Sequence, residues 1–200
     1  KKQQKKGLMQ KLLTGEVRLP GFDGEWEEVR LGEVADLYQP QTIAQSEMEL
    51  EGYPVYGANG LIGYYSKYNH ETWQIMITCR GSTCGTVNKS AEKSWITGNA
   101  MVVNVDNSIN VDKKFIYYLC LNQNFNSIIS GSGQPQITRT PLSNFKITIS
   151  DNIEEQKAIA KILTTADKEI ELLTQELEQL KLQKKGLMQL LLTGIVRVKS

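Results

Sequence analysis

The sequence predicts an α+β protein: a mixed α/β domain with many short strands, followed by a long helix of the coiled-coil type. Short alternating segments bounded by glycine and asparagine turns fill the middle of the chain, as is typical of strands and hairpins. A seam of leucine and isoleucine at spacings of three and four follows, which is typical of a helix that packs against another helix. With 40% hydrophobic residues among 200, the chain can bury a core.

An internal repeat frames the chain. Residues 4–18 read QKKGLMQKLLTGEVR and residues 183–197 read QKKGLMQLLLTGIVR, so 13 of 15 positions agree at an offset of 179. This distance is too long for a solenoid period, and it indicates that one helical unit was duplicated with a different domain between the copies. We therefore expect residues 1–19 to be the tail of a preceding helical region, residues 20–150 a separate domain and residues 151–200 a long helix.

The helix predicted from residue 151 has a narrow apolar stripe. Asp151 and Glu154 form a capping-box pattern at its start, and no proline interrupts residues 151–190. At 1.5 Å per residue this helix would span roughly 55–60 Å. The expected helix-pairing residues, interrupted once by Lys184, are Leu163, Ala166, Ile170, Leu173, Leu177, Leu180, Leu187 and Leu191. So long a seam needs a partner helix; the alternative is that the helix folds back on its own domain.

The middle domain should alternate strands and turns. We predict a strand at 26–31, a hairpin at 54–65 around an Asn-Gly turn, a second hairpin from 75–80 and 85–88, and strands at 100–105 and 145–149. Residues 112–122 should form a helix with Phe115, Ile116, Leu119 and Cys120 facing inward. A glycine-rich loop, SGSGQPQITRT at residues 130–140, precedes the last strand.

The motifs argue against an enzyme. His70 is the only histidine, and Cys79 and Cys84 lack the paired ligands of a zinc site. The phosphate-binding GxxxxGK[ST] loop is absent, and no two prolines are adjacent, as an amino-methylation motif of the NPPY type requires. We therefore expect no catalytic residue, no metal and no cofactor. Three cysteines, no signal peptide and no long apolar run indicate a cytoplasmic protein without a membrane span.

Charge is uneven along the chain, although the net charge is only +1. Residues 20–150 hold nine basic and thirteen acidic side chains, so the middle domain is acidic as a whole. The balance reverses within residues 57–90, where Glu71 is opposed by Lys67, Arg80 and Lys89. A basic face on an acidic domain permits contact with nucleic acid.

Polar, basic and tyrosine side chains crowd the loops of the middle domain. Arginine pairs with guanine, and asparagine or glutamine with adenine, while lysine, serine, threonine and tyrosine bind phosphates. The candidate DNA-binding residues are Asn59, Tyr64, Lys67, Tyr68, Arg80, Ser82, Thr83, Lys89, Gln134, Gln136 and Arg139. Any one of them could belong to an ordinary solvated loop or, for the tyrosines, partly to the core, so the prediction depends on the cluster.

Six motifs together resemble one family. They are WxxVxLGEV at residues 26–34, PVYGANGxIGYY at 54–65, RGSxxGTV at 80–87, GQPQI at 133–137, EEQKAIAxILxxAD at 154–167 and QKKGLMQxLLTG at 183–194. Over nearly the whole chain they resemble the specificity (S) subunit of type I restriction–modification systems. The sequence departs from the family at Ser150-Asp151, where members often have prolines, and this affects only the junction of strand and helix.

The resemblance implies a non-catalytic subunit that recognises double-stranded DNA. Members usually alternate two target-recognition domains with two antiparallel helices, and each domain reads half of a split site for methyltransferase and restriction subunits. One domain, one complete helix and a stub resemble half of such a subunit, either a C-terminal half or a half-length form that would act as a homodimer. The alternative from another class is a coiled-coil assembly or adaptor protein whose middle domain binds a different ligand.

Overall fold

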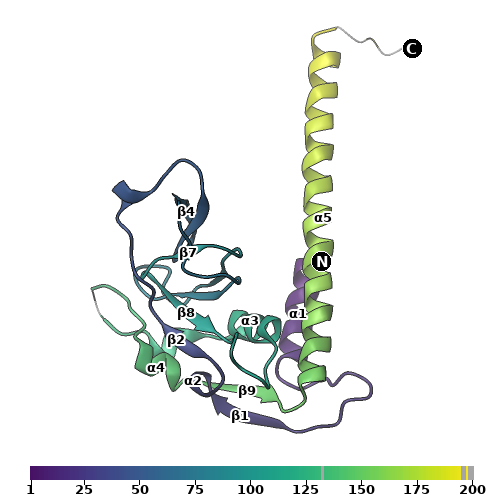
Figure 1. Cartoon of the computed structure of the whole chain (residues 1–200). Coiled ribbons are helices and arrows are strands. Elements are labelled where there is room, and N and C mark those ends of the chain that lie inside the picture. The colour runs from purple at the N-terminus through teal and green to yellow at the C-terminus, as the bar shows by residue number, and fades with distance from the viewer. Residues whose placement is uncertain (132, 195–196, 198–200) are drawn as a thin grey trace.

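The computed structural model describes residues 1–131, 133–194 and 197. It consists of a mixed α/β domain and one long helix, α5 (Ile153–Leu192), that rises from one edge of the domain (Figure 1). The predicted fold class is confirmed. Ser132 of the expected glycine-rich loop, and residues 195, 196 and 198–200 of the expected helical segment, lie outside the described residues.

The described strands form three sheets. The first is the antiparallel pair of β1 (Trp26–Arg30) and β9 (Lys146–Ser150). The second, in spatial order, consists of β2 (Asp36–Tyr38), β8 (Ala100–Asn104), β5 (Ile75–Thr78) and β6 (Val87–Lys89). The third consists of β4 (Gly60–Tyr65), β3 (Tyr53–Gly57) and β7 (Trp95–Ile96), and its β3–β7 pair is parallel. The two predicted hairpins and the predicted strands are thus confirmed.

Short helices complete the domain. They are α1 (Lys2–Leu12), α2 (Leu31–Val34), α3 (Lys113–Asn122) and α4 (Arg139–Ser143), with 3₁₀ turns η1 (Gln45–Glu47) and η2 (Phe125–Ile128). α3 begins after Asp112, whose side chain accepts a hydrogen bond from the Phe115 amide at 2.8 Å, as an N-cap residue does. Its inward face was predicted correctly, because Phe115, Ile116, Leu119 and Cys120 are all buried.

The main hydrophobic core lies between the four-stranded sheet, α3, the β1–β9 pair and the base of α5. It includes Leu12 and Leu13 from the segment expected to be a separate tail, and Ile159 and Leu163 from the segment expected to be a separate helix. The core therefore crosses both expected domain boundaries.

Two local predictions were wrong by one residue. The cap of α5 is Asn152, whose side chain accepts from the amides of Glu154 and Glu155, and it is not the predicted Asp151. The amide of Asp151 instead donates to the Glu25 carbonyl, which extends the strand pairing and delays the helix. In the first hairpin a register shift between Val55 and Tyr56 places the turn at Ala58 and Asn59, one position before the expected Asn-Gly pair.

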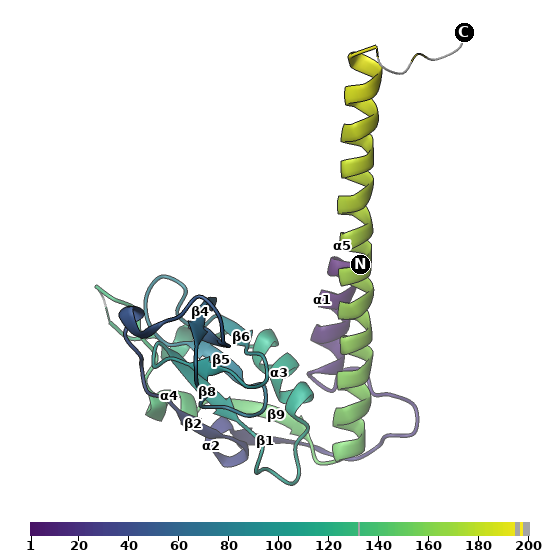
Figure 2. The same cartoon turned by 45° about the horizontal axis from the view of Figure 1, so that its top comes forward.

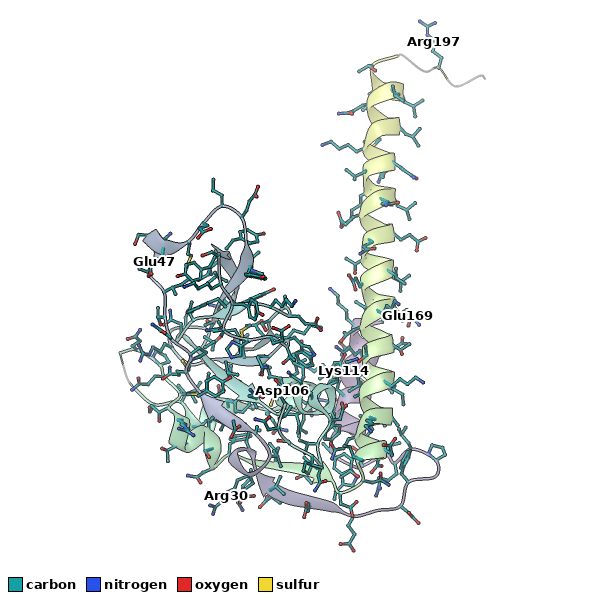
Figure 3. The ribbon with its side chains drawn as sticks, in the orientation of Figure 1. Arg30, Glu47, Asp106, Lys114, Glu169 and Arg197 are labelled. Atoms are coloured by element: carbon teal, nitrogen blue, oxygen red, sulfur yellow. The ribbon has the colours of Figure 1, made fainter. Side chains whose placement is uncertain are left out.

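α1 runs antiparallel to the lower part of α5, and the upper part of α5 projects beyond the domain (Figures 1 and 2). Figure 3 shows the side chains of this upper part pointing into open space, and Arg197 beyond its end. Among the described residues, no helix is both long enough and apolar enough to cross a membrane.

Candidate functional site

Three loops meet at one end of the four-stranded sheet. They are the turn of the β3–β4 hairpin, the β5–β6 loop at residues 80–84, and the glycine-rich loop that leads to α4. The residues of these loops that were predicted to bind DNA are all exposed, and we call them the loop surface: Asn59, Arg80, Ser82, Thr83, Gln134 and Gln136.

Hydrogen bonds tie the first two loops together. The carbonyl of Ala58 in the hairpin turn accepts from the hydroxyl of Thr78 at 3.0 Å and from the side-chain amide of Asn88 at 2.9 Å. Thr78 ends β5 just before Arg80, and its own carbonyl accepts from the Gly85 amide at 2.8 Å. These bonds hold Asn59 next to the loop that carries Arg80.

The glycine-rich loop is fixed to the same place by backbone contacts. Ser130 and Gln136 exchange backbone hydrogen bonds of 2.8 and 2.9 Å, and the amide of Gly81 donates to the Pro135 carbonyl at 3.0 Å. Arg80 and Gln136 pair as an isolated antiparallel bridge. Gln136 therefore lies beside Arg80, and both views show this loop projecting from the side of the domain away from α5 (Figures 1 and 2).

The segments that carry two of these loops contain no acidic residue. Neither 72–91 nor 113–150 includes an aspartate or glutamate, whereas each contains an exposed arginine, Arg80 and Arg139 respectively. Arg139 begins α4, three residues after Gln136 of the loop surface. Polar side chains around basic ones, without nearby carboxylates on the same segments, are suited to an anionic partner.

Three predicted DNA-binding residues lie elsewhere, at the base of the β3–β4 hairpin. We call Tyr64, Lys67 and Tyr68 the hairpin-base group. The ring of Tyr68 packs edge-on against Tyr53 with centroids 4.8 Å apart, and a hydrogen bond to Glu71 raises the pKa of Tyr68. Glu49 pairs with Tyr64 as an isolated antiparallel bridge, so two acidic residues, Glu49 and Glu71, belong to the segments around this group.

Lys89 is also separate from the loop surface. It pairs with Ile75 at the far end of the β5–β6 ladder from Arg80. Its ammonium lies 5.5 Å from the centre of the Tyr117 ring of α3. Lys89 therefore faces the side of the domain that carries α3.

The single histidine has a structural role. The side chain of His70 is buried; its Nε2 accepts from the Tyr38 hydroxyl at 2.9 Å and its Nδ1 donates to Asn69 Oδ1 at 2.6 Å. Asn69 in turn bonds both the amide and the carbonyl of Ile96 in β7. Burial lowers the pKa of His70, so the neutral ring joins two sheets. Among the described residues, no group of three or more His, Cys, Asp or Glu side chains could hold a metal.

The expected helix-pairing residues divide into two sets along α5. Leu163 is fully buried in the core, and Ala166 and Ile170 are partly covered where α1 crosses them. The remaining members are exposed on the upper part of the helix: Leu173, Leu177, Leu180, Leu187 and Leu191.

A buried ion pair at the base of α5 was not anticipated from the sequence. The carboxylate of Glu155 is fully buried and accepts from Arg18 at 2.6 and 2.9 Å, from Ser150 at 2.5 Å and from Trp26 Nε1 at 3.2 Å. Burial acts to raise the pKa of Glu155, but the hydrogen bonds from Arg18 and Ser150 outweigh it and the pKa is lowered. Gln156, also buried, donates to the Ser150 carbonyl at 2.8 Å and accepts from the Asp112 amide at 2.8 Å. The sequence feature from which these buried contacts could have been predicted is the EEQ segment at the start of α5.

Comparison with known proteins points to one family. A profile described as Type I restriction modification DNA specificity domain matches residues 23–182. The MjaVIII type I restriction enzyme specificity subunit of Methanocaldococcus jannaschii is 28% identical over 98% of this chain and 54% of its own length. The EcoprrI specificity subunit of Escherichia coli is 30% identical over 72% of this chain and 36% of its own length. The chain thus spans about half the length, or less, of these relatives.

Solved structures share the fold. The crystal structure of the S subunit of a type I restriction–modification system from M. genitalium superposes with a TM-score of 0.70 over 82% of this chain and 44% of that one, at 22% identity. The HsdS subunit from Thermoanaerobacter tengcongensis gives a TM-score of 0.61 over 87% of this chain and 46% of that one, at 21% identity.

Proposed function

The chain belongs to the family of type I restriction modification DNA specificity domains, and from this premise we propose that its loop surface reads one half of a bipartite DNA site. In this proposal, methyltransferase and restriction subunits carry out the chemistry, and this chain only directs them to their site on double-stranded DNA. Family membership favours this function over that of a coiled-coil adaptor with a different ligand.

The observation that carries the proposal is the convergence of three loops around Arg80. Arg80, Asn59 and Gln136 have the side chains that pair bidentately with guanine and adenine in the major groove. They come from segments 20 or more residues apart. Side-chain hydrogen bonds from Thr78 and Asn88 hold the Asn59 loop, and backbone hydrogen bonds hold the loops of Arg80 and Gln136. Side chains on a fixed backbone lose less conformational entropy when they bind, as base recognition requires.

The remaining candidates take secondary roles in this proposal. Ser82 and Thr83 share the β5–β6 loop with Arg80, and Arg139 follows Gln136 by three residues. In this proposal they contact phosphates, which position a protein on DNA without reading sequence. The hairpin-base group lies at the opposite end of the β3–β4 hairpin from Asn59, and Lys89 is on the α3 side, so contact with DNA there would require a second surface.

The proposed role of α5 is to hold two recognition domains at a fixed separation. Its upper part exposes a leucine seam, and a seam on one helix is stabilised by a second helix. When no other specificity chain is present, a second copy of this chain, related to the first by a twofold axis, supplies the second recognition domain and the second helix. The two half-sites should then be inverted copies, because twofold symmetry of a protein imposes the same symmetry on its site.

Mapping of methylated bases tests the proposal. The chain is produced with its cognate methyltransferase subunit in a host that has no other methyltransferase, and the modified positions are located across the genome. We expect one bipartite motif that disappears when the chain is omitted. Methylation that is the same with and without the chain would contradict a recognition role.

A further inference from the structure

The lower part of α5 is a binding site for the first copy of the internal repeat. Salt bridges join Lys1 to Glu169 and Lys5 to Asp167, and they are followed by the ion pair of Arg18 with Glu155, so the two segments run in opposite directions. Leu12 and Leu13 are 4% and 2% exposed in the same core cluster as Leu163. We call the α5 residues that receive the first copy the seat: Glu155, Ile159, Leu163, Ala166, Asp167 and Ile170.

Other residues shape the seat for this sequence. The hydroxyl of Tyr118 donates to Asp167 at 2.7 Å, and the ammonium of Lys5 lies 5.0 Å from the centre of the Tyr118 ring. The ring of Trp26 covers Gly15, where an added Cβ would stand 3.1 Å from the indole. The seat, together with Tyr118 and Trp26, therefore accommodates a lysine, a leucine pair, a glycine and an arginine in that order along the chain.

The tip of α5 carries the same side chains in the same order. Adding the offset of 179 converts Lys5, Leu12, Leu13, Gly15 and Arg18 into Lys184, Leu191, Leu192, Gly194 and Arg197. Gly15 and Gly194 have the same φ of +72°, so the two copies agree in backbone conformation at this glycine. The environments differ, because Leu191 and Leu192 are 45% and 81% exposed.

Two α5 helices that pair in the same register as α1 on the seat would form a symmetric antiparallel pair. Leu8 shares one hollow with Ala166 and Ile170, so its counterpart Leu187 would lie against Ala166 of a second chain. Continuing this register upward brings Leu180 opposite Leu173, and Leu177 opposite its own copy. The seam is thus self-complementary about Leu177, provided that α1 leaves the seat.

We propose that α1 and the tip of α5 are alternative occupants of one seat. In a single chain α1 covers the seat; in a pair of chains each tip binds the seat of the other copy and displaces its α1. Lys184 and Arg197 then form with Asp167 and Glu155 of the second copy the contacts that Lys5 and Arg18 form within one chain. This inference rests on the proposed pairing through α5, and it adds that α1 competes with dimer formation.

Equivalent positions in the two copies of the repeat supply matched variants. These variants distinguish competition between α1 and the tip of α5 from a general effect of charge on helix association. Lys5→Glu weakens α1 on the seat and leaves the tip intact, so we expect the dimer dissociation constant to fall about tenfold; Lys184→Glu should raise it about tenfold. Lys6→Glu and Lys185→Glu make the same charge change at exposed positions of the two copies and are the controls. Sedimentation equilibrium measures all four. A change in the same direction for Lys5→Glu and Lys184→Glu would overturn the competition.

Disulfide trapping tests the register, in a Cys84→Ser background because Cys84 is the native cysteine that is not buried. Leu8→Cys with Ala166→Cys should close within one chain and give a monomer that dimerises after reduction. Ala166→Cys with Leu187→Cys should crosslink two chains, because 21 residues of helix separate these positions within one chain by roughly 30 Å.

The outcomes distinguish the exchange from the pairing itself. A dimer that persists when the disulfide holds α1 on the seat would refute the exchange but would still be consistent with pairing of two α5 helices. A chain that stays monomeric in every variant would refute the exchange and the proposed homodimer, whereas methylation mapping judges DNA recognition by itself.

Discussion

Arg18 and Glu155 form a bidentate ion pair, with Nε–Oε1 at 2.6 Å and Nη2–Oε2 at 2.9 Å, across the junction between the first repeat copy and α5. Arg18 also donates to the Gly24 carbonyl at 2.6 Å, so the same guanidinium holds the chain that enters β1. A buried carboxylate with four donors depends on all of them, because removing one partner of a buried pair strongly destabilises a protein.

Replacing this carboxylate should therefore lower stability. For Glu155→Ala we expect a loss of about 3 kcal/mol in the free energy of unfolding, equivalent to a melting temperature lower by roughly 10 °C. Glu154→Ala is the matched control, since Glu154 is the exposed neighbour of the same type. Thermal unfolding followed by circular dichroism measures both, and equal melting temperatures for the two variants would contradict a stabilising role of the junction.

His70 should titrate below its ordinary pKa of 6.5, because burial lowers it. The unfolded chain binds a proton near pH 6.5 and the folded chain only at lower pH, so the free energy of unfolding falls as the pH drops through this interval. NMR can measure the pKa of His70 without ambiguity in assignment, because the chain has one histidine. Tyr38→Phe removes the hydroxyl that donates to the neutral ring and should raise the pKa toward 6.5. A wild-type value at or above 6.5 would show that the ring is not held in its neutral form.

Arg80→Ala should weaken DNA binding in a sequence-dependent way. If Arg80 pairs with a guanine, the loss on the cognate duplex is about 1–3 kcal/mol, and the loss on unrelated DNA is smaller. Arg139→Ala should weaken binding to both duplexes and reduce the salt dependence. Lys161→Ala removes one charge from an exposed position on α5 and is the control. Unchanged binding by both arginine variants would move the DNA-binding surface elsewhere.

Gly131→Ala should damage recognition with little effect on the core. Gly131 has a φ of +92°, and a Cβ there would lie 2.5 Å from the carbonyl oxygen of Gln134, so an alanine forces the loop to move. Gly133→Ala in the same loop meets nothing within 4 Å. We expect reduced methylation of the cognate motif with Gly131→Ala alone and near-normal melting temperatures for both. Equal methylation by the two variants would mean that the shape of this loop does not matter for reading.

Adding one heptad to α5 near Glu176 should widen the gap between half-sites. Seven residues preserve the seam and lengthen the helix by about 10 Å, or about three base pairs at 3.4 Å per step. The half-site sequences should stay the same, because the loop surface is unchanged. Methylation mapping of the insertion variant measures the gap. An active variant with an unaltered gap would show that α5 does not set the spacing.

Local features of the fold were predictable from the sequence, and long-range contacts were not. Alternating apolar residues and glycines indicated the β3–β4 and β5–β6 hairpins, whose strands are neighbours along the chain. The pairing of Trp26 with Ser150, and the parallel pairing of Val55 with Trp95, join distant segments. Such pairs depend on how the whole core packs, and no local pattern encodes them.

The candidate site was likewise predictable from the sequence only in part. Residue type and loop position selected Arg80, Asn59 and Gln136 as candidates, and the structure brings the loops that carry them together. The same criteria selected Tyr68 and Lys89, which lie at other ends of their hairpins, because a sequence does not reveal which end of a ladder a side chain occupies. The repeat was evident, but its first copy was expected to belong to a helix outside this domain, and its position on α5 of the same chain emerged only from tertiary contacts.

The pairing of β1 with β9 makes the recognition domain a cassette. Its entry and exit are adjacent strands, closed by the hydrogen bond from the Asp151 amide to the Glu25 carbonyl at 3.2 Å. Everything between them could be transplanted without moving either helix, provided that the incoming domain supplies apolar side chains such as Phe115 against Ile159 and Leu163. Under the proposed function, such a graft should change the bases that are recognised and leave the spacing between half-sites as it is in the recipient protein.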